Sequence, residues 1–254
     1  MRTFIVHAHP EPRSLNGALT DLAVTTLRDA GHEVKVSDLY AMRWKATVDA
    51  DDVGAASDPL RVVEDSGRAY ETGTLSADIA AEQDKLRWAD TVILQFPLWW
   101  YSMPAILEGW VDRVFTYKFA YGVGEHSDTR YGEGTLAGKR AVLSVTIGGR
   151  EPYYSDRGIN GPIDDLLFPI QHGILYYPGM DVLPPFVTYA AHRLSPEDFT
   201  DTAKAWEQRL LSIEKTAPIA YRPQNGGDYE RPALRLREGL EAKGRTGFGL
   251  HIRP

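Results

Sequence analysis

The chain contains no cysteine, which excludes disulfides, thiolate nucleophiles, iron–sulfur clusters and cysteine-bound zinc. Any redox chemistry therefore requires a bound cofactor. Positive charge is not in excess either, since 28 basic residues stand against 35 acidic ones, and we expect no nucleic-acid partner. No run of about 18 apolar residues occurs, and the apolar run near the N-terminus, Phe4 to Val6, is too short for a signal-peptide core. We therefore expect a cytoplasmic protein without an integral membrane segment.

What is present is typical of a globular chain. It has 254 residues, of which 43% are hydrophobic and 25% charged. A folded chain of this size hides roughly 75% of its unfolded surface, so one large α/β domain suffices. We predict this domain over residues 1–217. Residues 218–254 contain several prolines and glycines and are predicted as a C-terminal arm, packed on the domain or on a dimer partner, with one short helix near 233–240.

Short apolar runs alternate with stretches of helical period, which is typical of a parallel sheet covered by helices. The predicted strands are residues 3–8, 33–39, 91–96, 141–147 and 181–187, the last weakened by Pro184 and Pro185. The predicted helices are residues 15–30, 76–89, 104–115 and 196–215. Residues 43–73 are predicted as a polar, acidic connection, far longer than the usual loop of about 4 to 6 residues. The fold class is therefore α/β, a doubly wound parallel sheet of five strands with helices on both faces.

Ligands of such a sheet bind beyond the carboxyl ends of its strands. The segment after the first strand, His9 to Gly17, is a polar loop that leads into a helix. The N–H groups and the dipole of a helix start can hold a phosphate, although the chain has neither a Walker nor a GxGxxG motif. The alternative is that Ser14 is an ordinary helix cap.

Two further segments follow strands at the same edge. After the third strand, Trp99, Trp100 and Tyr101 stand between prolines and cannot all face one core, so at least one ring lines a cleft or an interface. After the fourth strand, Gly148 and Gly149 allow a ligand to approach the backbone, and tyrosines beyond them supply hydroxyl donors. Together the loops suit the flat isoalloxazine ring of a flavin. No GxSxG, HExxH or carboxylate-rich cluster occurs, and no metal site is predicted.

Several motifs also carry a family resemblance. They include Ser14-Leu15-Asn16, Gln95-Phe96-Pro97-Leu98-Trp99-Trp100, Pro104-Ala105-Ile106-Leu107-Glu108-Gly109-Trp110, Phe119-Ala120-Tyr121, Thr146-Ile147-Gly148-Gly149 and Phe168-Pro169-Ile170-Gln171-His172-Gly173-Ile174-Leu175. From about residue 3 to residue 218 the chain resembles the long-chain NAD(P)H:quinone oxidoreductases, or DT-diaphorases, whereas the tail is not clearly matched. The resemblance implies a flavodoxin-like fold and a homodimer with FAD at the subunit boundary. It also implies two-electron hydride transfer from NAD(P)H to quinones, and to nitro or azo aromatics, in a ping-pong cycle.

The resemblance implies a role for each matching residue. On the diphosphate and adenosine side of FAD these are His9, Ser14, Leu15, Asn16 and Ala18; along the isoalloxazine they are Pro97, Leu98, Trp99, Trp100 and Tyr101; at its pyrimidine edge they are Thr146, Ile147, Gly148, Gly149 and Tyr154. The box in which nicotinamide and quinone stack in turn is implied to be Trp100, Tyr101, Tyr121, Tyr131 and Tyr177. The implied catalytic pair is Tyr154 and Asn160.

Two positions depart from the family pattern. Asn160 stands where the family has a histidine, and an amide cannot be protonated, although it still donates hydrogen bonds. We therefore expect Tyr154 to matter more than Asn160. Phe199 stands where the family has an arginine near the adenosine, which leaves FMN open as the less favoured flavin. The rival hypotheses are a flavin-binding regulatory or accessory subunit of a partner protein with little turnover, and a colourless relative without flavin.

Overall fold

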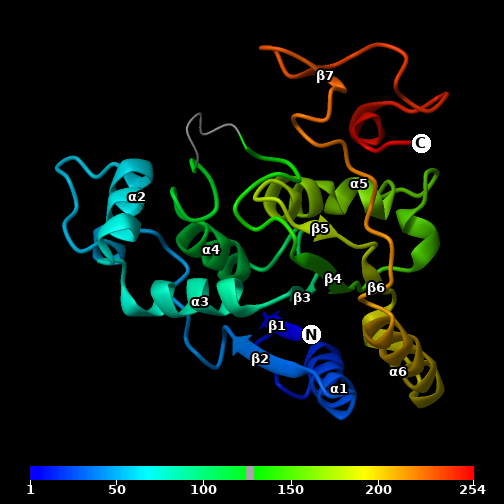
Figure 1. Cartoon of the computed structure of the whole chain (residues 1–254). Helices are drawn as coiled ribbons and strands as arrows, with labels where there is room; N and C mark the ends of the chain where they lie inside the picture. Colours follow the sequence, from blue (N-terminus) through cyan, green and yellow to red (C-terminus); the bar gives the residue numbers. More distant parts are fainter. Residues whose placement is uncertain (124–128) are drawn as a thin grey trace.

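The computed structural model describes residues 1–123 and 129–254. Its centre is a sheet in the order β2-β1-β3-β4-β5 (Figure 1). The four long strands are β1 (Arg2–His7), β2 (Glu33–Asp38), β3 (Thr91–Pro97) and β4 (Arg140–Thr146). All neighbours in this sheet pair in parallel. The predicted doubly wound parallel sheet is confirmed, and its switch point lies between β1 and β3.

The fifth strand differs from the prediction. In place of one strand over 181–187 the structure has two short ones, β5 (Asp181–Val182) and β6 (Phe186–Thr188), which both pair with β4. Pro184 and Pro185 lie between them. Proline has no N–H group to donate to a neighbouring strand, so the pairing is interrupted where the two prolines stand.

The four predicted helices are present as α1 (Leu15–Asp29), α3 (Ala77–Trp88), α4 (Ala105–Val114) and α6 (Pro196–Leu211). Ser14 caps α1 by accepting a hydrogen bond from the N–H of Gly17, and Ser195 caps α6 in a capping box with Asp198. The sequence patterns did not predict three further elements, which are α2 (Val62–Thr72), α5 (Ile163–Phe168) and the π-helix η3 (Pro169–Tyr176). Within residues 1–123 and 129–254 there are also four short 3₁₀ segments: η1 (Ala50–Asp52), η2 (Glu151–Tyr154), η4 (Ala191–Arg193) and η5 (Gly247–His251).

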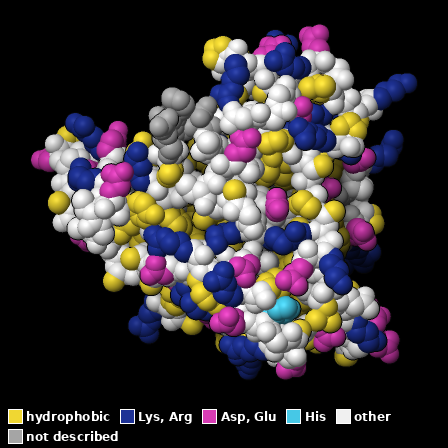
Figure 2. Space-filling model, viewed as in Figure 1, with side chains coloured by type: hydrophobic (Ala, Val, Ile, Leu, Met, Phe, Trp, Pro, Cys, Tyr) yellow, Lys and Arg dark blue, Asp and Glu magenta, His cyan; other side chains and the backbone are white. Residues whose placement is uncertain are grey.

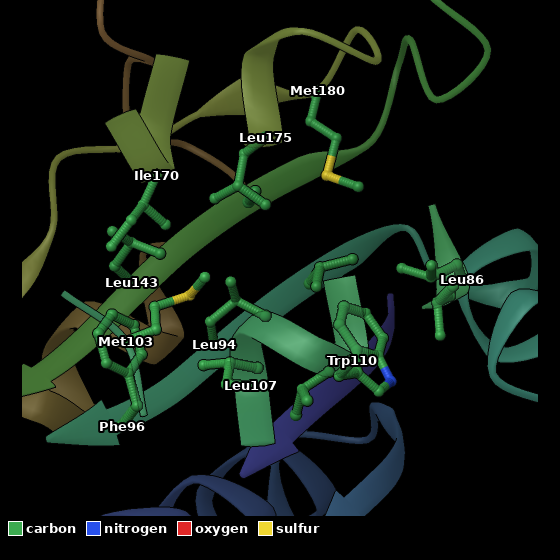
Figure 3. Close-up of a cluster of buried hydrophobic side chains, with 14 of the residues drawn as sticks. Leu86, Leu94, Phe96, Met103, Leu107, Trp110, Leu143, Ile170, Leu175 and Met180 are labelled. Carbon is green, nitrogen blue, oxygen red and sulfur yellow. The ribbon is translucent and has the colours of Figure 1, made fainter. Parts of the chain in front are cut away.

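The helices cover both faces of the sheet. In Figure 1, α1 and α6 lie on one side of the strands, and α4 and α5 lie on the other. Side chains alternate accordingly along β1, because Ile5 packs in the core under α1 and α6, whereas Phe4 and Val6 pack in the larger core of the opposite face. Figure 3 shows this larger core, in which Leu107 and Trp110 of α4 meet Leu94 and Phe96 of β3.

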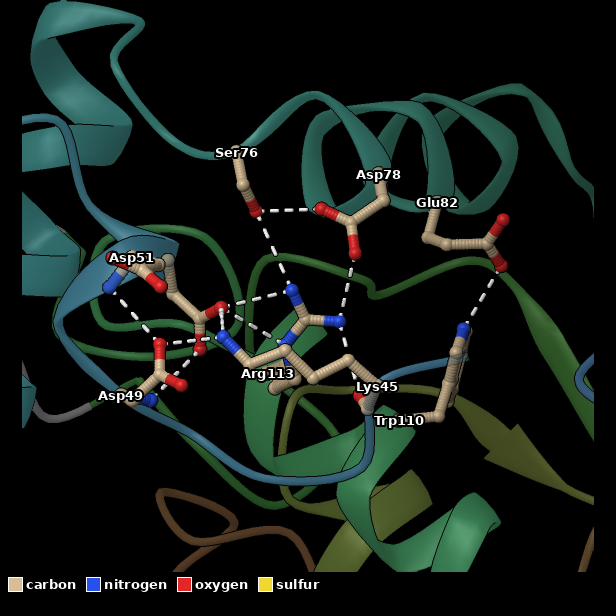
Figure 4. Close-up of polar contacts among 9 residues, drawn as sticks. Lys45, Asp49, Asp51, Ser76, Asp78, Glu82, Trp110 and Arg113 are labelled. Atoms are coloured by element: carbon tan, nitrogen blue, oxygen red, sulfur yellow. Dashed lines mark hydrogen bonds and ion pairs between the residues drawn. The ribbon is translucent and has the colours of Figure 1, made fainter. Parts of the chain in front are cut away.

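The prediction of a loop over residues 43–73 was wrong, because this excursion contains η1 and α2. A buried ion network ties it to the domain (Figure 4). Arg113 Nη2 lies 2.8 Å from Asp52 Oδ1, and Arg113 Nη1 lies 2.8 Å from Asp78 Oδ2. Lys45 Nζ lies 2.8 Å from the same Asp52 oxygen. The excursion is therefore an ordered part of the fold.

The C-terminal arm packs on the domain of its own chain. Ile219 donates its N–H to the carbonyl of Val182 at 2.8 Å, and the Tyr176 hydroxyl donates to the carbonyl of Tyr221 at 3.1 Å. The predicted helix near 233–240 was wrong. The segment instead holds β8 (Arg235–Leu236), which pairs antiparallel with β7 (Tyr229–Glu230), because Leu234 takes a left-handed conformation that turns the chain back. The boundary between residues 217 and 218 stays a prediction.

On the face shown in Figure 2, acidic and basic side chains are interspersed, and neither sign forms a continuous area. Among the described residues, 1–123 and 129–254, no helix combines the length and the apolar character needed to cross a lipid bilayer.

Candidate functional site

The three predicted loops meet at the carboxyl edge of the sheet. The N–H of Ala8 donates to the carbonyl of Gln95 at 3.0 Å, which joins the ends of β1 and β3. The N–H of Leu98 donates to the carbonyl of Thr146 at 2.9 Å, which joins the ends of β3 and β4. The rings of His9 and Trp99 lie 6.1 Å apart. The fold thus gathers segments that are far apart in the sequence into one edge.

Asn16 holds these loops together from inside. Its side chain is buried, donates from Nδ2 to Thr146 Oγ1 at 2.9 Å, and accepts at Oδ1 from Gln95 Nε2 at 2.8 Å. Both ends of the amide are therefore engaged within the protein. In this structure Asn16 supports the edge by linking the first α1 turn to β3 and β4.

A groove of about 380 Å³ runs between the starts of α1 and α6. Ser14, Leu15 and Ala18 line one side of it, and Ser195 and Phe199 line the other. Two helix starts, both with capping serines, face this groove. The positive ends of two helix dipoles at one groove favour an anionic ligand such as a diphosphate.

The aromatic loop is a tight turn with two residues in the left-handed region. Trp99 and Ser102 exchange backbone hydrogen bonds of 3.1 and 3.0 Å, while Trp100 has a φ of 50° and Tyr101 a φ of 64°. Positive φ values at both central positions are typical of a type I′ turn, which usually contains asparagine or glycine. The turn presents its rings to solvent, since Trp100 is 96% exposed and Tyr101 50% exposed.

The edge also offers donors without acceptors. In the part of the chain that the structure describes, the N–H groups of Trp100, Tyr101, Gly148 and Gly149 donate to no acceptor. A flat ring with carbonyl oxygens and ring nitrogens along one edge can accept from such groups while it stacks on an aromatic side chain. The residues at this edge therefore fit a flavin ring.

Tyr154 lies directly against Gly149. A Cβ atom on Gly149 would come within 2.8 Å of Tyr154 Cε2 and 3.0 Å of its hydroxyl oxygen, so only glycine leaves the ring in place. Burial raises the pKa of the Tyr154 phenol, the neighbouring Tyr101 raises it further, and a hydrogen bond with Asn160 opposes both. The phenol therefore keeps its proton at neutral pH and is a hydrogen-bond donor at the edge.

The residues predicted for the substrate box fall into two groups. Tyr121 and Tyr131 both pack on Tyr177, with ring centroids 6.3 and 5.1 Å apart, and burial raises the pKa of Tyr121 and of Tyr131. Among the described residues, no ring contact joins this tyrosine cluster to Trp100 or Tyr101. One chain therefore does not bring the five residues of the predicted box together.

The cluster extends into an aromatic stack that the sequence analysis missed. Tyr131, His172, Phe168 and Phe248 stack in succession, at centroid distances of 4.8, 4.6 and 4.3 Å. They line a cavity of about 310 Å³ together with His251. Burial lowers the pKa of His172 to about 4, followed by the effect of His251. Only the unusual frequency of aromatic and histidine residues in these segments hints at the stack in the sequence.

Comparisons with known proteins identify the family of the chain. A family model described as a flavodoxin-like fold matches residues 1–210. The chain is 41% identical over 256 residues to NAD(P)H dehydrogenase [quinone] 1 of Cavia porcellus, which covers 99% of this chain and 92% of that protein. The chain belongs to the flavodoxin-like NAD(P)H:quinone oxidoreductase family. This confirms the resemblance found in the motifs.

Two further relatives of this quinone oxidoreductase chain correct the expectation about its tail. A ribosyldihydronicotinamide dehydrogenase-like protein of Penicillium crustosum is 54% identical over 259 residues, covering 100% of this chain and 96% of that protein. The crystal structure of a putative quinone reductase from Klebsiella pneumoniae is 58% identical, with a TM-score of 0.96 over 99% of both chains. Both matches include the arm, which sequence motifs alone did not match. In the described residues no group of three potential metal ligands occurs.

Proposed function

We propose that the chain is a flavin-dependent NAD(P)H:quinone oxidoreductase that transfers a hydride from NAD(P)H to a quinone. Bound flavin supplies the chemistry, because it accepts two electrons from the nicotinamide and returns them to the acceptor. The observation that carries the proposal is the edge at which four free N–H groups, an aromatic turn and the Tyr154 phenol meet. This edge suits a flat redox ring better than a charged metabolite.

In this proposal each loop has a separate task. The N–H groups of Gly148 and Gly149 hold the ring by its acceptor atoms, and Trp99 and Trp100 limit where it lies. Tyr154 donates a hydrogen bond at the point where negative charge develops, and Asn160 supports it with its amide. Preorganised donors of this kind need no reorientation during the reaction. Asn160 therefore replaces the histidine of the family as a hydrogen-bond donor, but it cannot be protonated, and part of the rate is lost.

FAD is the proposed flavin, with FMN as the alternative. The support is the groove between α1 and α6, since two helix starts there can hold a diphosphate. Phe199 lines this groove and offers a ring for stacking where the family has a charge. Chromatography of the flavin released from the purified protein distinguishes the two.

A homodimer is part of the proposal. Two large apolar side chains are almost fully exposed, Trp100 at 96% and Ile159 at 91%. Within one chain, the cluster of Tyr121, Tyr131 and Tyr177 also lies apart from the aromatic turn. A second copy that places its Tyr121, Tyr131 and Tyr177 opposite Trp100 and Tyr101 would complete one box. One shared box implies that nicotinamide and quinone bind in turn, which gives ping-pong kinetics; nitro and azo aromatics are proposed as further acceptors. The proposed location is the cytoplasm.

The test is a visible absorbance spectrum of the purified protein, followed by a steady-state assay of quinone reduction. We expect the purified protein to show the visible absorbance of an oxidised flavin and to reduce menadione with NADH or NADPH in steady state, with parallel lines in double-reciprocal plots. A yellow protein with negligible turnover would favour the accessory-subunit hypothesis. A protein that stays colourless after incubation with FAD and with FMN would refute the proposed function.

A further inference from the structure

The segment after β6 lies against the segment after β4 that contains the glycine pair, Gly148 and Gly149. The N–H of Ala191 donates to the carbonyl of Ile147 at 2.9 Å, and the N–H of Ala190 donates to the carbonyl of Gly149 at 2.8 Å. Ala190 has a φ of 50°, a left-handed conformation that residues with a side chain rarely adopt. The two backbone hydrogen bonds hold this turn, so η4 starts beside the glycine pair.

His192 of η4 brings its side chain to the glycine pair. A Cβ on Gly148 would meet the imidazole first, with Nδ1 at 3.5 Å and Cε1 at 3.8 Å. Nδ1 is therefore the nearer of the two ring nitrogens to Gly148. The side chain is exposed, and within residues 1–123 and 129–254 its hydrogen bond is made at Nε2, not at Nδ1. The imidazole thus presents Nδ1 at the edge where the N–H groups of the glycine pair also lack acceptors.

Arg193 determines which nitrogen of this imidazole carries the proton. Its Nε donates to His192 Nε2 at 3.0 Å. A guanidinium keeps its protons and can only donate, so Nε2 is an accepting, unprotonated nitrogen in this bond. A neutral imidazole has one ring proton, and the bond leaves it on Nδ1. The contact with Arg193 therefore makes Nδ1–H a donor on the side of Gly148.

The position of η4 also connects the two parts of the proposed flavin site. Ala191 and Leu194, the residues before and after the pair of His192 and Arg193, line the groove of about 380 Å³ between α1 and α6. The imidazole of the same segment meets Gly148. A ligand that spans the glycine pair and the groove therefore lies beside His192.

We propose that His192 is a further flavin-binding residue, whose Nδ1–H donates to an acceptor atom at the ring edge that the glycine pair also binds, and that Arg193 is a positioning residue that fixes this tautomer. The inference rests on the proposed function for the identity of the ligand. Arg193 acts through the imidazole, because it excludes the tautomer in which an unprotonated Nδ1 would face the acceptor atoms of the ring.

The first measurement is the tautomer itself, in the flavin-free protein. Protonated and unprotonated ring nitrogens give well-separated ¹⁵N resonances, and His192→Phe identifies the pair that belongs to His192. At pH 8, where a free imidazole is neutral, we expect a protonated Nδ1 and an unprotonated Nε2. In Arg193→Ala the two tautomers exchange, so we expect the two resonances to move towards each other.

Arg13→Ala is the matched control for Arg193→Ala. Arg13 lines the same groove and carries the same charge, but its Nε donates to Glu11 at 3.0 Å and not to His192. We expect Arg13→Ala to leave both ¹⁵N resonances of His192 unchanged.

The second measurement is the dissociation constant of the flavin that the purified protein releases, FAD or FMN, from fluorescence titration in about 1 M salt, where the Debye length of about 3 Å screens the Arg193 charge. His192→Phe keeps a flat ring without a donor, and loss of one hydrogen bond should weaken binding about two- to tenfold. Arg193→Ala should weaken it by the inverse of the fraction of molecules that keep the proton on Nδ1, which the ¹⁵N resonances give independently. In the His192→Phe background Arg193→Ala should have no further effect.

A proton on Nε2 in the parent protein, or unchanged ¹⁵N resonances in Arg193→Ala, would overturn the inference. So would unchanged flavin affinity in His192→Phe, or an effect of Arg193→Ala that adds to it in the double variant. Neither measurement requires turnover, so a protein that binds flavin but does not reduce quinones would count against the proposed function alone.

Discussion

Helix α4 connects two regions that differ in whether their polar groups have partners within the protein. In its second half, the Arg113 side chain is 2% exposed and its nitrogens contact Asp52, Asp78 and the carbonyl of Lys45. Before its first residue, the turn leaves the N–H groups of Trp100 and Tyr101 without acceptors in the described chain. Trp100 is 96% exposed and Tyr101 50% exposed, so these N–H groups face solvent and are available to a ligand, whereas the polar groups around Arg113 are already paired inside the protein.

The inner region contains a second buried carboxylate whose oxygens all have partners. Glu82 is fully buried, and its oxygens accept from Trp110 Nε1 at 2.8 Å, from Lys85 Nζ at 2.5 Å and from the Ser37 hydroxyl. Such a network orders a core when every member has a partner. Charge inside this domain is therefore structural, whereas the outer edge relies on neutral donors and aromatic rings. Three of the four predictions below test this division, and the four are arranged in order of decreasing effect.

The largest effect is expected from breaking the inner network. Burial alone would lower the pKa of Arg113, but Asp52 and Asp78 raise it, so the side chain stays charged. Arg113→Met leaves the buried Asp52 carboxylate with Lys45 as its remaining cationic partner, and removal of one partner of a buried ion pair costs about 3 to 5 kcal/mol. We expect this loss in urea-induced unfolding of the holoprotein, with little change in the rate of flavin reduction per folded molecule.

Arg2→Ala is the matched control for Arg113→Met. Arg2 contacts Asp90 at 2.6 Å, but both side chains are 45% exposed, and ion pairs of this kind contribute little to stability. Equal losses of stability in the two variants would show that burial of the inner network does not matter.

The second prediction concerns the outer edge. Tyr154→Phe removes one donor from the point of developing charge, and loss of such a donor typically lowers a rate by about 10² to 10³. We expect this decrease in stopped-flow reduction by NADPH, without a change in the unfolding midpoint, because the lost hydroxyl is at the surface of the fold. A rate that equals that of the parent protein would show that Tyr154 does not have this role.

Local patterns were sufficient for the frame of the fold. Ser14 and Ser195 mark the starts of α1 and α6 because capping is a local interaction between a side chain and the next turn. Apolar runs located β1, β3 and β4 because strands buried on both faces are almost wholly apolar. The three loops of the site then followed from the rule for strand ends.

Long-range interactions explain what the sequence did not reveal. Helix α2 contains Gly67 and begins with two valines, so its propensity is poor, and Asp65 supports its start by accepting from the N–H groups of Ser57 and Arg61. Helix α5 and the π-helix η3 were not predicted, because proline and glycine usually mark loops and this segment contains Pro162, Pro169 and Gly173.

At the site, the link between Asn16 and Thr146 spans 130 residues and has no local signature. The same is true of the bond between Tyr101 and Asn160. Residue types therefore indicated the edge, but only the fold shows how its side chains are connected.

The third prediction uses a group that belongs to neither region. His172 Nε2 is buried and has no partner within the described chain, and burial lowers the pKa of His172 from 6.5 to about 4. Because the unfolded chain takes up the proton first, His172 has no effect on stability above pH 6.5 and destabilises the fold as the pH falls below it. At pH 5 this penalty is at most about 2 kcal/mol.

His172→Phe keeps a ring between Phe168 and Tyr131 and cannot be protonated. We expect the free energy of unfolding to fall less between pH 7 and pH 5 in this variant than in the parent protein. Equal decreases in the two proteins would show that the imidazole titrates normally in the fold.

The smallest effect separates two adjacent glycines. A Cβ on Gly149 would lie 2.8 Å from Tyr154 Cε2, whereas a Cβ on Gly148 would meet nothing nearer than His192 Nδ1 at 3.5 Å. Gly149→Ala should therefore displace the Tyr154 ring by a few tenths of an ångström and slow flavin reduction about tenfold, since small misplacements reduce catalysis. In the flavin-free protein we expect Gly149→Ala, but not Gly148→Ala, to shift the ¹³Cζ resonance of Tyr154. If both variants shift it equally, the close contact between Tyr154 and Gly149 is not what positions the phenol.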